Sequence, residues 1–154
     1  MLESFQFHHI GYVTYSIADT SSIYRSAGYH ASEVIEDTIQ QTKVCFLTKN
    51  NNPCIELIEP ITEDSSVNKI LKSNRGTMPY HICYEANDID GAFDAMIEMK
   101  YIPLFRAVEA IALGNRLICY FYKKEIGFIE IISPPSVILL VYWVIIQKRI
   151  AKDN

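Results

Sequence analysis

The sequence lacks any run of basic residues longer than a pair. Its 14 Lys and Arg residues stand against 18 Asp and Glu residues, which gives a formal net charge of −4 at pH 7. A chain with this balance offers few cations to a phosphate backbone. Nucleic acid is therefore excluded as an expected partner.

The sequence also lacks the patterns that direct a chain into or across a membrane. Residues 1–10 contain no basic region followed by an apolar stretch, so a secretory signal is not expected. The longest apolar run, residues 137–146, falls well short of the roughly 20 residues that a helix needs to cross a bilayer. We therefore expect a cytoplasmic protein without a transmembrane span.

Cysteine is sparse, and no two cysteines have the Cys-x-x-Cys spacing that is typical of zinc ribbons and redox motifs. Each cysteine lies in an apolar, strand-like stretch, so we expect reduced thiols in the core and no disulfide or zinc framework. The four residues are Cys45, Cys54, Cys83 and Cys119.

What the sequence does contain is an internal repeat. Residues 9–29 align without a gap on residues 81–101, at an offset of 72, and residues 45–60 align on residues 119–134, at an offset of 74. A repeat of this kind usually means that one supersecondary unit is built twice. The length of 154 residues and the 49% hydrophobic content suit one compact domain made of two such units.

Each repeat contains a His and a Glu at matching positions. His9 aligns with His81, and Glu56 aligns with Glu130. We therefore expect these four side chains to be related by a pseudo-twofold axis. The repeat also selects His9 over its neighbour His8, since Tyr80 occupies the position that matches His8. We interpret His8 as a structural residue or a support for a ligand.

The apolar periodicity predicts the same order of elements in both units. The first unit is predicted to contain a strand, a helix and three strands at residues 7–13, 17–27, 33–39, 44–47 and 53–58. The second is predicted to contain a strand at 80–85, a helix at 89–99 capped by Asn87 or Asp88, and strands near Leu104, at 116–122 and at 127–132.

The predicted fold is of the α+β class, with two βαβββ modules in tandem that form one domain over residues 1–133. The modules are residues 7–60 and 78–133, joined by a linker, residues 61–77, that contains one short helix near residues 67–72. The tail, residues 134–154, contains the apolar run 137–146. We favour packing on a sheet face or dimerisation for this run, with a membrane-surface anchor as the alternative.

Glu56 and Glu130 are each flanked by apolar residues on both sides. A buried ionised carboxylate is costly without a partner, and a divalent metal ion is the simplest partner. Either Glu alone is explained as a solvent-facing side chain on a half-buried strand. The repeated placement beside a repeated His favours a single metal site with His9, Glu56, His81 and Glu130 as ligands. Imidazole and carboxylate suit nickel, cobalt, zinc, iron or manganese, so the identity of the metal stays open.

Several segments resemble a known superfamily, in the same order along the chain. They are His9-Ile10-Gly11-Tyr12-Val13, residues 55–60 (IELIEP), residues 64–69 (DSSVNK), His81-Ile82-Cys83-Tyr84-Glu85 and Gly127-Phe128-Ile129-Glu130. Over residues 7–133 the chain is similar to the vicinal oxygen chelate superfamily, which includes glyoxalases, bleomycin resistance proteins and dioxygenases. Within it, the chain most resembles methylmalonyl-CoA epimerases and small bacterial glyoxalase I-like proteins.

The resemblance implies an open half-barrel with a divalent metal ion at its base, held by the four residues that the repeat selects. It also implies proton transfer next to a thioester or hemithioacetal carbon, through an enediolate that the metal stabilises, with Glu130 or Glu56 as the base. The implied partner is a small-molecule substrate, an acyl-CoA thioester or a hemithioacetal. A homodimer is a further expectation.

Two departures favour the epimerase over glyoxalase I. Glyoxalase I usually has an Arg four residues after its first metal His and an Asn four residues after its first metal Glu, where this chain has Val13 and Pro60. Other departures concern the epimerases, because Tyr80 replaces the first of their usual His pair and their Gly-rich loop is reduced to Ala112-Leu113-Gly114.

The hypothesis is therefore a metal-dependent isomerase or lyase, epimerase-like, with a lactoylglutathione lyase as the alternative. An iron dioxygenase needs two His and one carboxylate, so the fourth ligand, Glu56, argues against it. A non-catalytic resistance-type binding protein typically lacks the full ligand set. We interpret the cations Lys43, Lys69, Lys72 and Arg75 as solvated residues, and contact with a CoA phosphate as the less favoured alternative.

Overall fold

The computed structural model describes residues 4–74 and 76–135. Within these ranges the elements are, in chain order, β1 (Gln6–Val13), α1 (Ile17–Ser26), β2 (His30–Ala31), β3 (Ile35–Asp37), β4 (Thr42–Thr48), β5 (Ile55–Pro60), α2 (Ser66–Asn74), β6 (Met78–Glu85), α3 (Ile89–Glu98), β7 (Ile102–Pro103), β8 (Val108–Ala110), a 3-10 helix (Ile111–Leu113), β9 (Arg116–Lys123) and β10 (Gly127–Ile132). The chain is thus an α+β protein, as its sequence predicts.

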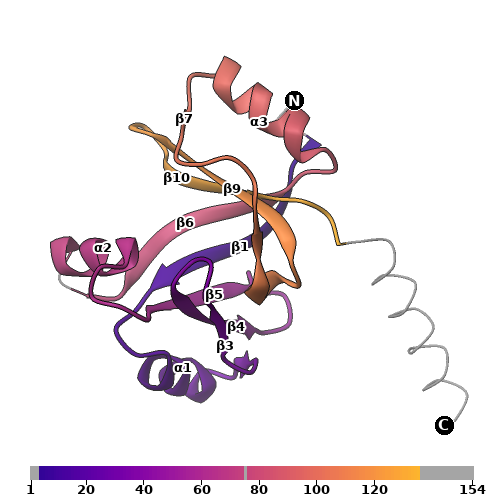
Figure 1. Cartoon of the computed structure of the whole chain (residues 1–154). Helices are drawn as coiled ribbons and strands as arrows, with labels where there is room; N and C mark the ends of the chain where they lie inside the picture. Colours follow the sequence, from indigo (N-terminus) through magenta and orange to yellow (C-terminus); the bar gives the residue numbers. More distant parts are fainter. Residues whose placement is uncertain (1–3, 75, 136–154) are drawn as a thin grey trace, which may run out of the picture.

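The strands form a single open sheet in the order β2-β4-β5-β1-β6-β10-β9-β7, with β3 beside β4 and β8 beside β9. The first strands of the two repeats, β1 and β6, lie antiparallel at the middle of this sheet (Figure 1). The other strands of the first repeat extend the sheet outward from β1, and those of the second repeat extend it outward from β6. The two predicted modules therefore meet edge to edge along β1 and β6.

The register of the strands confirms the pseudo-twofold relation of the repeats. Ile10 lies directly opposite Ile82, and these two residues are related by the repeat offset of 72. The parallel pairing of β1 with β5 has its counterpart in the parallel pairing of β6 with β10. The axis therefore passes between β1 and β6, near Ile10 and Ile82.

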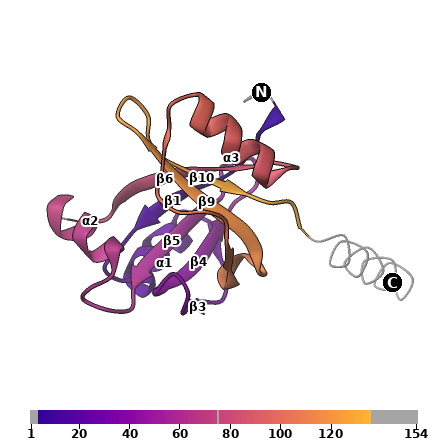
Figure 2. The ribbon, with the colours of Figure 1, turned by 45° about the horizontal axis from the view of Figure 1, so that its top comes forward.

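Helices α1 and α3 occupy equivalent positions in the two repeats and lie at opposite ends of the molecule (Figure 1). Each begins with a side-chain cap, because Ser16 accepts a hydrogen bond from Asp19 N and Asp88 accepts one from Gly91 N. Figure 2 shows α3 along the β9 and β10 part of the sheet. The cap predicted at residues 87–88 is confirmed at Asp88.

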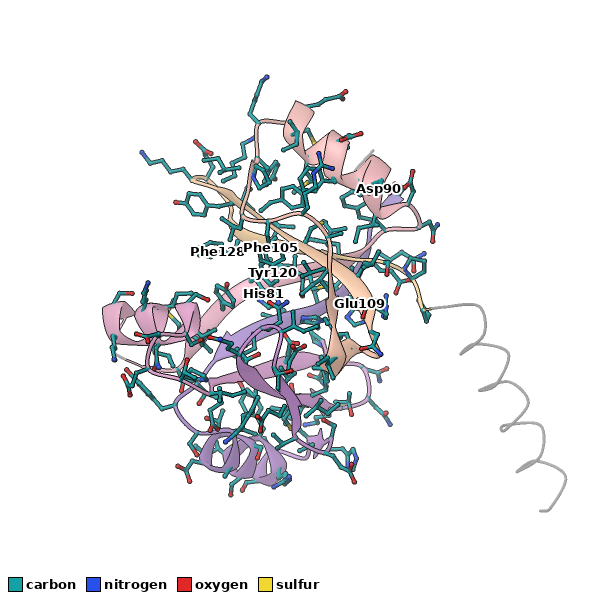
Figure 3. All side chains as sticks on the ribbon, viewed as in Figure 1. His81, Asp90, Phe105, Glu109, Tyr120 and Phe128 are labelled. Atoms are coloured by element: carbon teal, nitrogen blue, oxygen red, sulfur yellow. The ribbon has the colours of Figure 1, made fainter. Side chains whose placement is uncertain are left out.

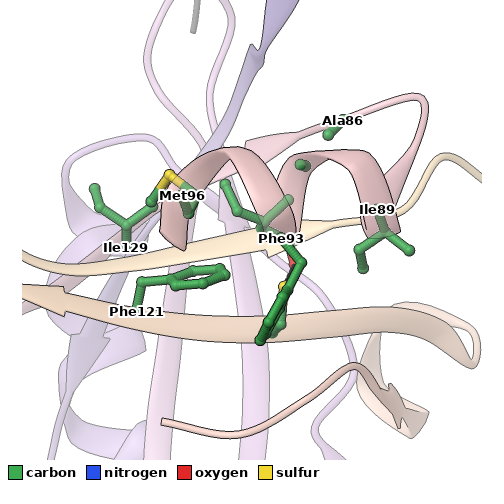
Figure 4. Packing of buried hydrophobic residues seen from close by; sticks show 9 residues of the cluster. Ala86, Ile89, Phe93, Met96, Phe121 and Ile129 are labelled. Atoms are coloured by element: carbon green, nitrogen blue, oxygen red, sulfur yellow. Dashed lines mark hydrogen bonds between the residues drawn. The ribbon is translucent and has the colours of Figure 1, made fainter. Parts of the chain in front are cut away.

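Each helix packs on the sheet through its own apolar cluster. Phe93 and Met96 of α3 pack with Phe121 and Ile129 of the sheet (Figure 4), and Phe93 lies 5.2 Å from Phe121 between ring centroids. Ile17 of α1 belongs to a separate buried cluster on β4 and β5. The helices thus cover the outer strands, and the opposite side of the sheet is left for the cavity described below.

The strand predicted directly after the helix of each unit differs from the structure. Residues 33–39 form a strand only at β3, because Asp37 Oδ1 accepts hydrogen bonds from Ile39 N and Gln40 N, at 3.0 and 2.9 Å, and turns the chain. In the second unit, Leu104 follows the two-residue β7 rather than lying in it. Conversely, α2 is longer than the helix predicted at residues 67–72.

All four cysteines are free thiols, as expected, but Cys54 is only half-buried and precedes β5 instead of lying in the core. The predictions for the apolar run 137–146 lie outside the described residues. Within the described residues, no helix is both long enough and apolar enough to cross a membrane.

Candidate metal centre

The four side chains selected by the repeat come together at the middle of the sheet. They project from four adjacent strands, Glu56 from β5, His9 from β1, His81 from β6 and Glu130 from β10. All four are buried, with exposed fractions of 4% or less. Figure 3 shows His81 in the middle of the molecule, between the two halves of the sheet.

The donor atoms converge on one point. His9 Nε2 lies 3.1 Å from His81 Nε2 and 3.2 Å from Oε2 of both Glu56 and Glu130. His81 Nε2 lies 3.1 Å from Glu130 Oε2 and 3.5 Å from Glu56 Oε2. Two donors that bind one ion at about 2.1 Å are roughly 3.0 to 3.4 Å apart at octahedral or tetrahedral angles. The spacings therefore fit a divalent ion.

The electrostatics of the cluster also call for a cation at its centre. Among the described residues, Glu130 Oε2 is a buried oxygen without a hydrogen-bond partner of normal geometry. Burial opposes protonation of His9, yet the carboxylates of Glu56 and Glu130 outweigh it and raise the pKa of His9 to about 10. Burial likewise acts to raise the pKa of Glu130, but His81 and His9 lower it well below its usual value. Two buried carboxylates thus hold positive charge strongly, as a metal site requires.

Gly11 makes room for this arrangement. It lies opposite His81 across the β1–β6 pairing, and a Cβ on Gly11 would lie 2.1 Å from His81 Cε1. A side chain at this position is incompatible with the observed place of the imidazole. The sequence contained a signal for this role, because a glycine inside a strand often marks a close approach.

His9 and His81 are each preceded by a bulge residue. The β1–β6 register shifts between Phe7 and His9 and again between Gly11 and Tyr12, which leaves His8 and Tyr80 as the extra residues. These two positions are also related by the repeat offset of 72. The two bulges therefore follow the same pseudo-twofold symmetry as the four clustered side chains.

Other side chains contact the second nitrogen of each imidazole. His8 Nδ1 lies 2.7 Å from His9 Nδ1, and the Tyr120 hydroxyl lies 3.3 Å from His81 Nδ1. Such contacts fix ring orientation and leave each Nε2 directed at the centre of the cluster. His8 thus lies beside the four-residue cluster and supports it, in keeping with its interpretation from the sequence.

A charged residue that the sequence did not single out completes this support. Arg116 Nη1 lies 3.2 Å from His8 Nε2, its Nη2 forms an ion pair with Glu85, and its Nε donates to Ser133 O at 2.6 Å. Burial, followed by the charges of His9 and Arg116, lowers the pKa of His8. No sequence signal indicated Arg116, because its partners come from three other segments.

The cluster lies at the wall of a cavity of about 470 Å³. Glu56 and Glu130 line this cavity together with apolar side chains, so a small molecule in it would reach both carboxylates. The volume is within the range of small-molecule sites, roughly 300 to 1,000 Å³. No Lys, Arg or His lines the cavity in the described part of the chain.

Three of the cations considered for a CoA phosphate, Lys43, Lys69 and Lys72, are not among the residues that line the cavity. Lys43 pairs with Glu59 at 3.6 Å and Lys72 pairs with Glu63 at 2.6 Å, whereas Lys69 is exposed. Arg75 lies outside the described residues. Contact between these cations and a CoA phosphate stays a prediction.

Comparison with known proteins supports the family indicated by the sequence. The model of the glyoxalase/bleomycin resistance protein/dioxygenase superfamily matches residues 8–120. The human mitochondrial methylmalonyl-CoA epimerase is 24% identical over 121 residues, which cover 78% of this chain and 68% of the human protein.

Solved structures show the same fold at low sequence identity. A methylmalonyl-CoA epimerase from Mycobacterium tuberculosis matches with a TM-score of 0.76 at 18% identity, over 88% of this chain and 91% of the other. A hypothetical protein from Bacillus halodurans matches with a TM-score of 0.76 at 21% identity, over 86% and 96%. A variant of the Streptomyces coelicolor methylmalonyl-CoA epimerase, in complex with 2-nitronate-propionyl-CoA, matches with a TM-score of 0.73 at 20% identity, over 85% and 98%.

Proposed function

Because the chain belongs to the glyoxalase/bleomycin resistance protein/dioxygenase superfamily, we propose that it is a metal-dependent isomerase of the methylmalonyl-CoA epimerase type. The observation that carries this proposal is the convergence of His9, Glu56, His81 and Glu130 at the wall of a cavity. The reaction removes a proton from the carbon next to a thioester carbonyl and returns it on the opposite face.

Each residue has a distinct part in the proposed reaction. His9 and His81 would hold a divalent ion through Nε2, while their Nδ1 atoms contact His8 and Tyr120. A divalent ion held there would supply Lewis acidity, which would make the carbon next to the substrate's carbonyl more acidic. Glu56 and Glu130 would complete the ligand set, and their carboxylates would also carry the proton away from that carbon and back to it.

The placement of the two carboxylates supports an epimerisation. Glu56 and Glu130 project from β5 and β10, which flank the central pair β1 and β6 on opposite sides. Both carboxylates line the cavity. Inversion requires that one carboxylate remove the proton from one face of the carbon and the other return it on the opposite face, so one of the two must move away from the cluster when the substrate binds.

An isomerisation of a hemithioacetal, as in a lactoylglutathione lyase, is the second candidate. It uses the same ligands and the same proton transfer. The observation that favours it is the cavity lining, which in the described residues contains no cation for a CoA phosphate. A non-catalytic binding protein is disfavoured because both carboxylates face the cavity within reach of a bound molecule.

The experiment is a comparison of two substrates with the metal-reconstituted protein. Racemic methylmalonyl-CoA in D₂O and methylglyoxal with glutathione are offered in parallel, and deuterium uptake and product formation are followed by NMR and mass spectrometry. The proposal predicts deuterium at the acyl carbon of methylmalonyl-CoA. Turnover of the hemithioacetal alone would favour the second candidate.

Two variants test the proton carriers. Glu130→Gln and Glu56→Gln should each lower turnover by about 10²- to 10⁴-fold, the range typical of a lost general base. The exposed Glu109 of β8 provides the control Glu109→Gln, which should keep full activity. Full turnover in both of the first two variants would exclude these carboxylates as bases.

A further inference from the structure

The two halves of the cavity differ, although the ligands within them match. The half contributed by the second module presents aromatic rings, those of Tyr80, Phe105, Tyr120 and Phe128. The half contributed by the first module presents the polar residues Asp37, Gln40 and Thr42 beside the aliphatic Val44 and Ile58, and no aromatic ring of the described residues. The pseudo-twofold symmetry of the sheet is thus broken at the walls of the cavity.

The four rings form one continuous surface, which we name the aromatic wall. Tyr80 stacks on Tyr120 with ring centroids 6.0 Å apart and lies 5.3 Å from Phe128. Phe105 lies 5.6 Å from Tyr120. Figure 3 shows Phe105, Tyr120 and Phe128 gathered beside His81. Because the rings hold each other in place, the wall is preformed and needs little reorganisation on binding.

The wall reaches the candidate metal centre directly. The Tyr120 ring lies 5.1 Å from the His81 ring, and Tyr80 lies 5.0 Å from it. A molecule that binds an ion at the centre through two oxygens therefore has its next substituent within reach of the aromatic wall. The aromatic wall would therefore select the substituent, whereas the ion would select the two oxygens.

The charge of the cavity restricts that substituent further. Three carboxylates line the cavity, those of Asp37, Glu56 and Glu130, and no cationic side chain of the described residues accompanies them. A divalent ion would neutralise the negative charges of Glu56 and Glu130. The negative charge of Asp37 would stay without a cation. A second anionic group on the substrate, beyond the oxygens bound to the ion, would thus be repelled.

The available volume admits a group larger than methyl. An apolar cavity of about 150 Å³ is enough to bind benzene, whereas this cavity measures about 470 Å³. Space therefore remains for an aromatic ring after the two-oxygen unit is placed at the centre. A methyl group alone would leave much of the aromatic wall in contact with water.

We infer that the substrate carries an uncharged aromatic or branched aliphatic substituent on its reacting unit, and that this substituent packs on the aromatic wall. This inference rests on the proposed function, since it assumes that the ion binds two neighbouring oxygens of the substrate. It assigns the choice of substrate to Tyr80, Phe105, Tyr120 and Phe128. The two-oxygen unit is common to the whole class of candidate substrates.

Hydroxamates test the inference without turnover. Benzohydroxamate and acetohydroxamate present the same two-oxygen chelating group and differ in phenyl against methyl. Their dissociation constants are measured on the cobalt-loaded protein from its visible absorption, and their affinities for free Co²⁺ give the intrinsic ratio. Relative to that ratio, the protein should bind benzohydroxamate at least about tenfold more tightly, since even one methylene in an apolar pocket contributes a comparable factor.

Two variants link the preference to the aromatic wall. Phe105→Ala should reduce the preference for benzohydroxamate at least severalfold. Phe7→Ala is the matched control, because Phe7 is half-exposed and does not line the cavity. If Phe105→Ala does not fold, Phe128→Leu replaces it, with the same expected direction. A phenyl-to-methyl ratio equal to that of free Co²⁺, or one that Phe105→Ala leaves unchanged, would overturn the inference.

Turnover separates this inference from the proposed function. The hemithioacetal of phenylglyoxal is compared with that of methylglyoxal, and isopropylmalonyl-CoA with methylmalonyl-CoA. A protein that prefers benzohydroxamate but exchanges no proton in any of the four substrates supports the aromatic wall and refutes the proposed function. A protein that turns over the methyl-bearing substrates faster than the larger ones refutes the inference and keeps the proposed function.

Discussion

The substitution Gly11→Ala is expected to displace His81, a candidate metal ligand, without changing any donor atom. A Cβ on Gly11 would lie 2.1 Å from His81 Cε1, 2.5 Å from Nδ1 and 2.6 Å from Nε2. Ordinary van der Waals contact begins near 3.4 Å. The imidazole or the strand must therefore shift by about 1.3 Å, several times the tolerance of about 0.2 Å for a metal–ligand distance.

The expected loss of metal affinity follows from this displacement. Removing a group that only supports a ligand typically weakens metal binding by 10- to 100-fold. Displacing the ligand itself should exceed that range, so we expect an affinity at least about 100-fold lower. The crowded site should also lower the free energy of unfolding by about 1 to 3 kcal/mol, as overpacking in a core usually does.

The assay is a competition between the protein and a chelator for Zn²⁺ or Co²⁺, together with thermal unfolding of the metal-free protein. Gly91→Ala in α3 is the matched control, because a Cβ there would lie 2.4 Å from Asp88 Oδ2, far from the cluster. It should cost stability but leave metal affinity unchanged. Wild-type metal affinity in Gly11→Ala would refute the packing argument.

The remaining predictions concern the support of the ligands and the fold. His8→Phe should weaken metal binding by about 10- to 100-fold in the chelator assay, and His8→Gln should restore part of it, because a polar atom again faces His9 Nδ1. In the metal-free protein, the raised pKa of His9 stabilises the fold fully below pH 6.5, and this contribution is lost as the pH rises toward about 10. The thermal midpoint should therefore fall over that pH window. A midpoint that does not change with pH would contradict the ion pairs of His9 with Glu56 and Glu130. Asp88→Ala should cost about 1 kcal/mol in urea unfolding, with metal affinity unchanged, because it removes the cap of α3.

The internal repeat made most of this site predictable from the sequence. It selected His9, Glu56, His81 and Glu130, and the structure brings these four together. It also excluded His8 from the set, and His8 is found beside His9 in a bulge. A repeat is informative here because symmetry relates positions that are 72 residues apart in the chain.

Features that depend on contacts across the sheet were not predictable in the same way. The role of Gly11 follows from the β1–β6 register, which no single strand specifies. Arg116 supports His8 from β9, and its partners lie in other segments. The short β3 results from the hydrogen bonds of Asp37, a local competition that the alternation of apolar residues does not reveal.

The family comparison and the walls of the cavity provide different kinds of information. The superfamily match and the shared fold concern the family and the architecture of the chain, whereas the cluster of four candidate ligands is seen in this chain's own side chains. The aromatic wall comes from one module only and has no counterpart in the other. The repeat therefore predicts the metal centre, whereas the substrate depends on residues that the repeat does not relate.

The most direct test of the account is the metal content of the protein after loading with Co²⁺ or Zn²⁺ and removal of free ions. Elemental analysis should give one ion per chain for the wild type and for Glu109→Gln, and a large loss for Glu130→Ala and for His9→Ala. Absence of bound metal in the wild type, or full retention in both alanine variants, would contradict the assignment of the four buried side chains to a metal centre.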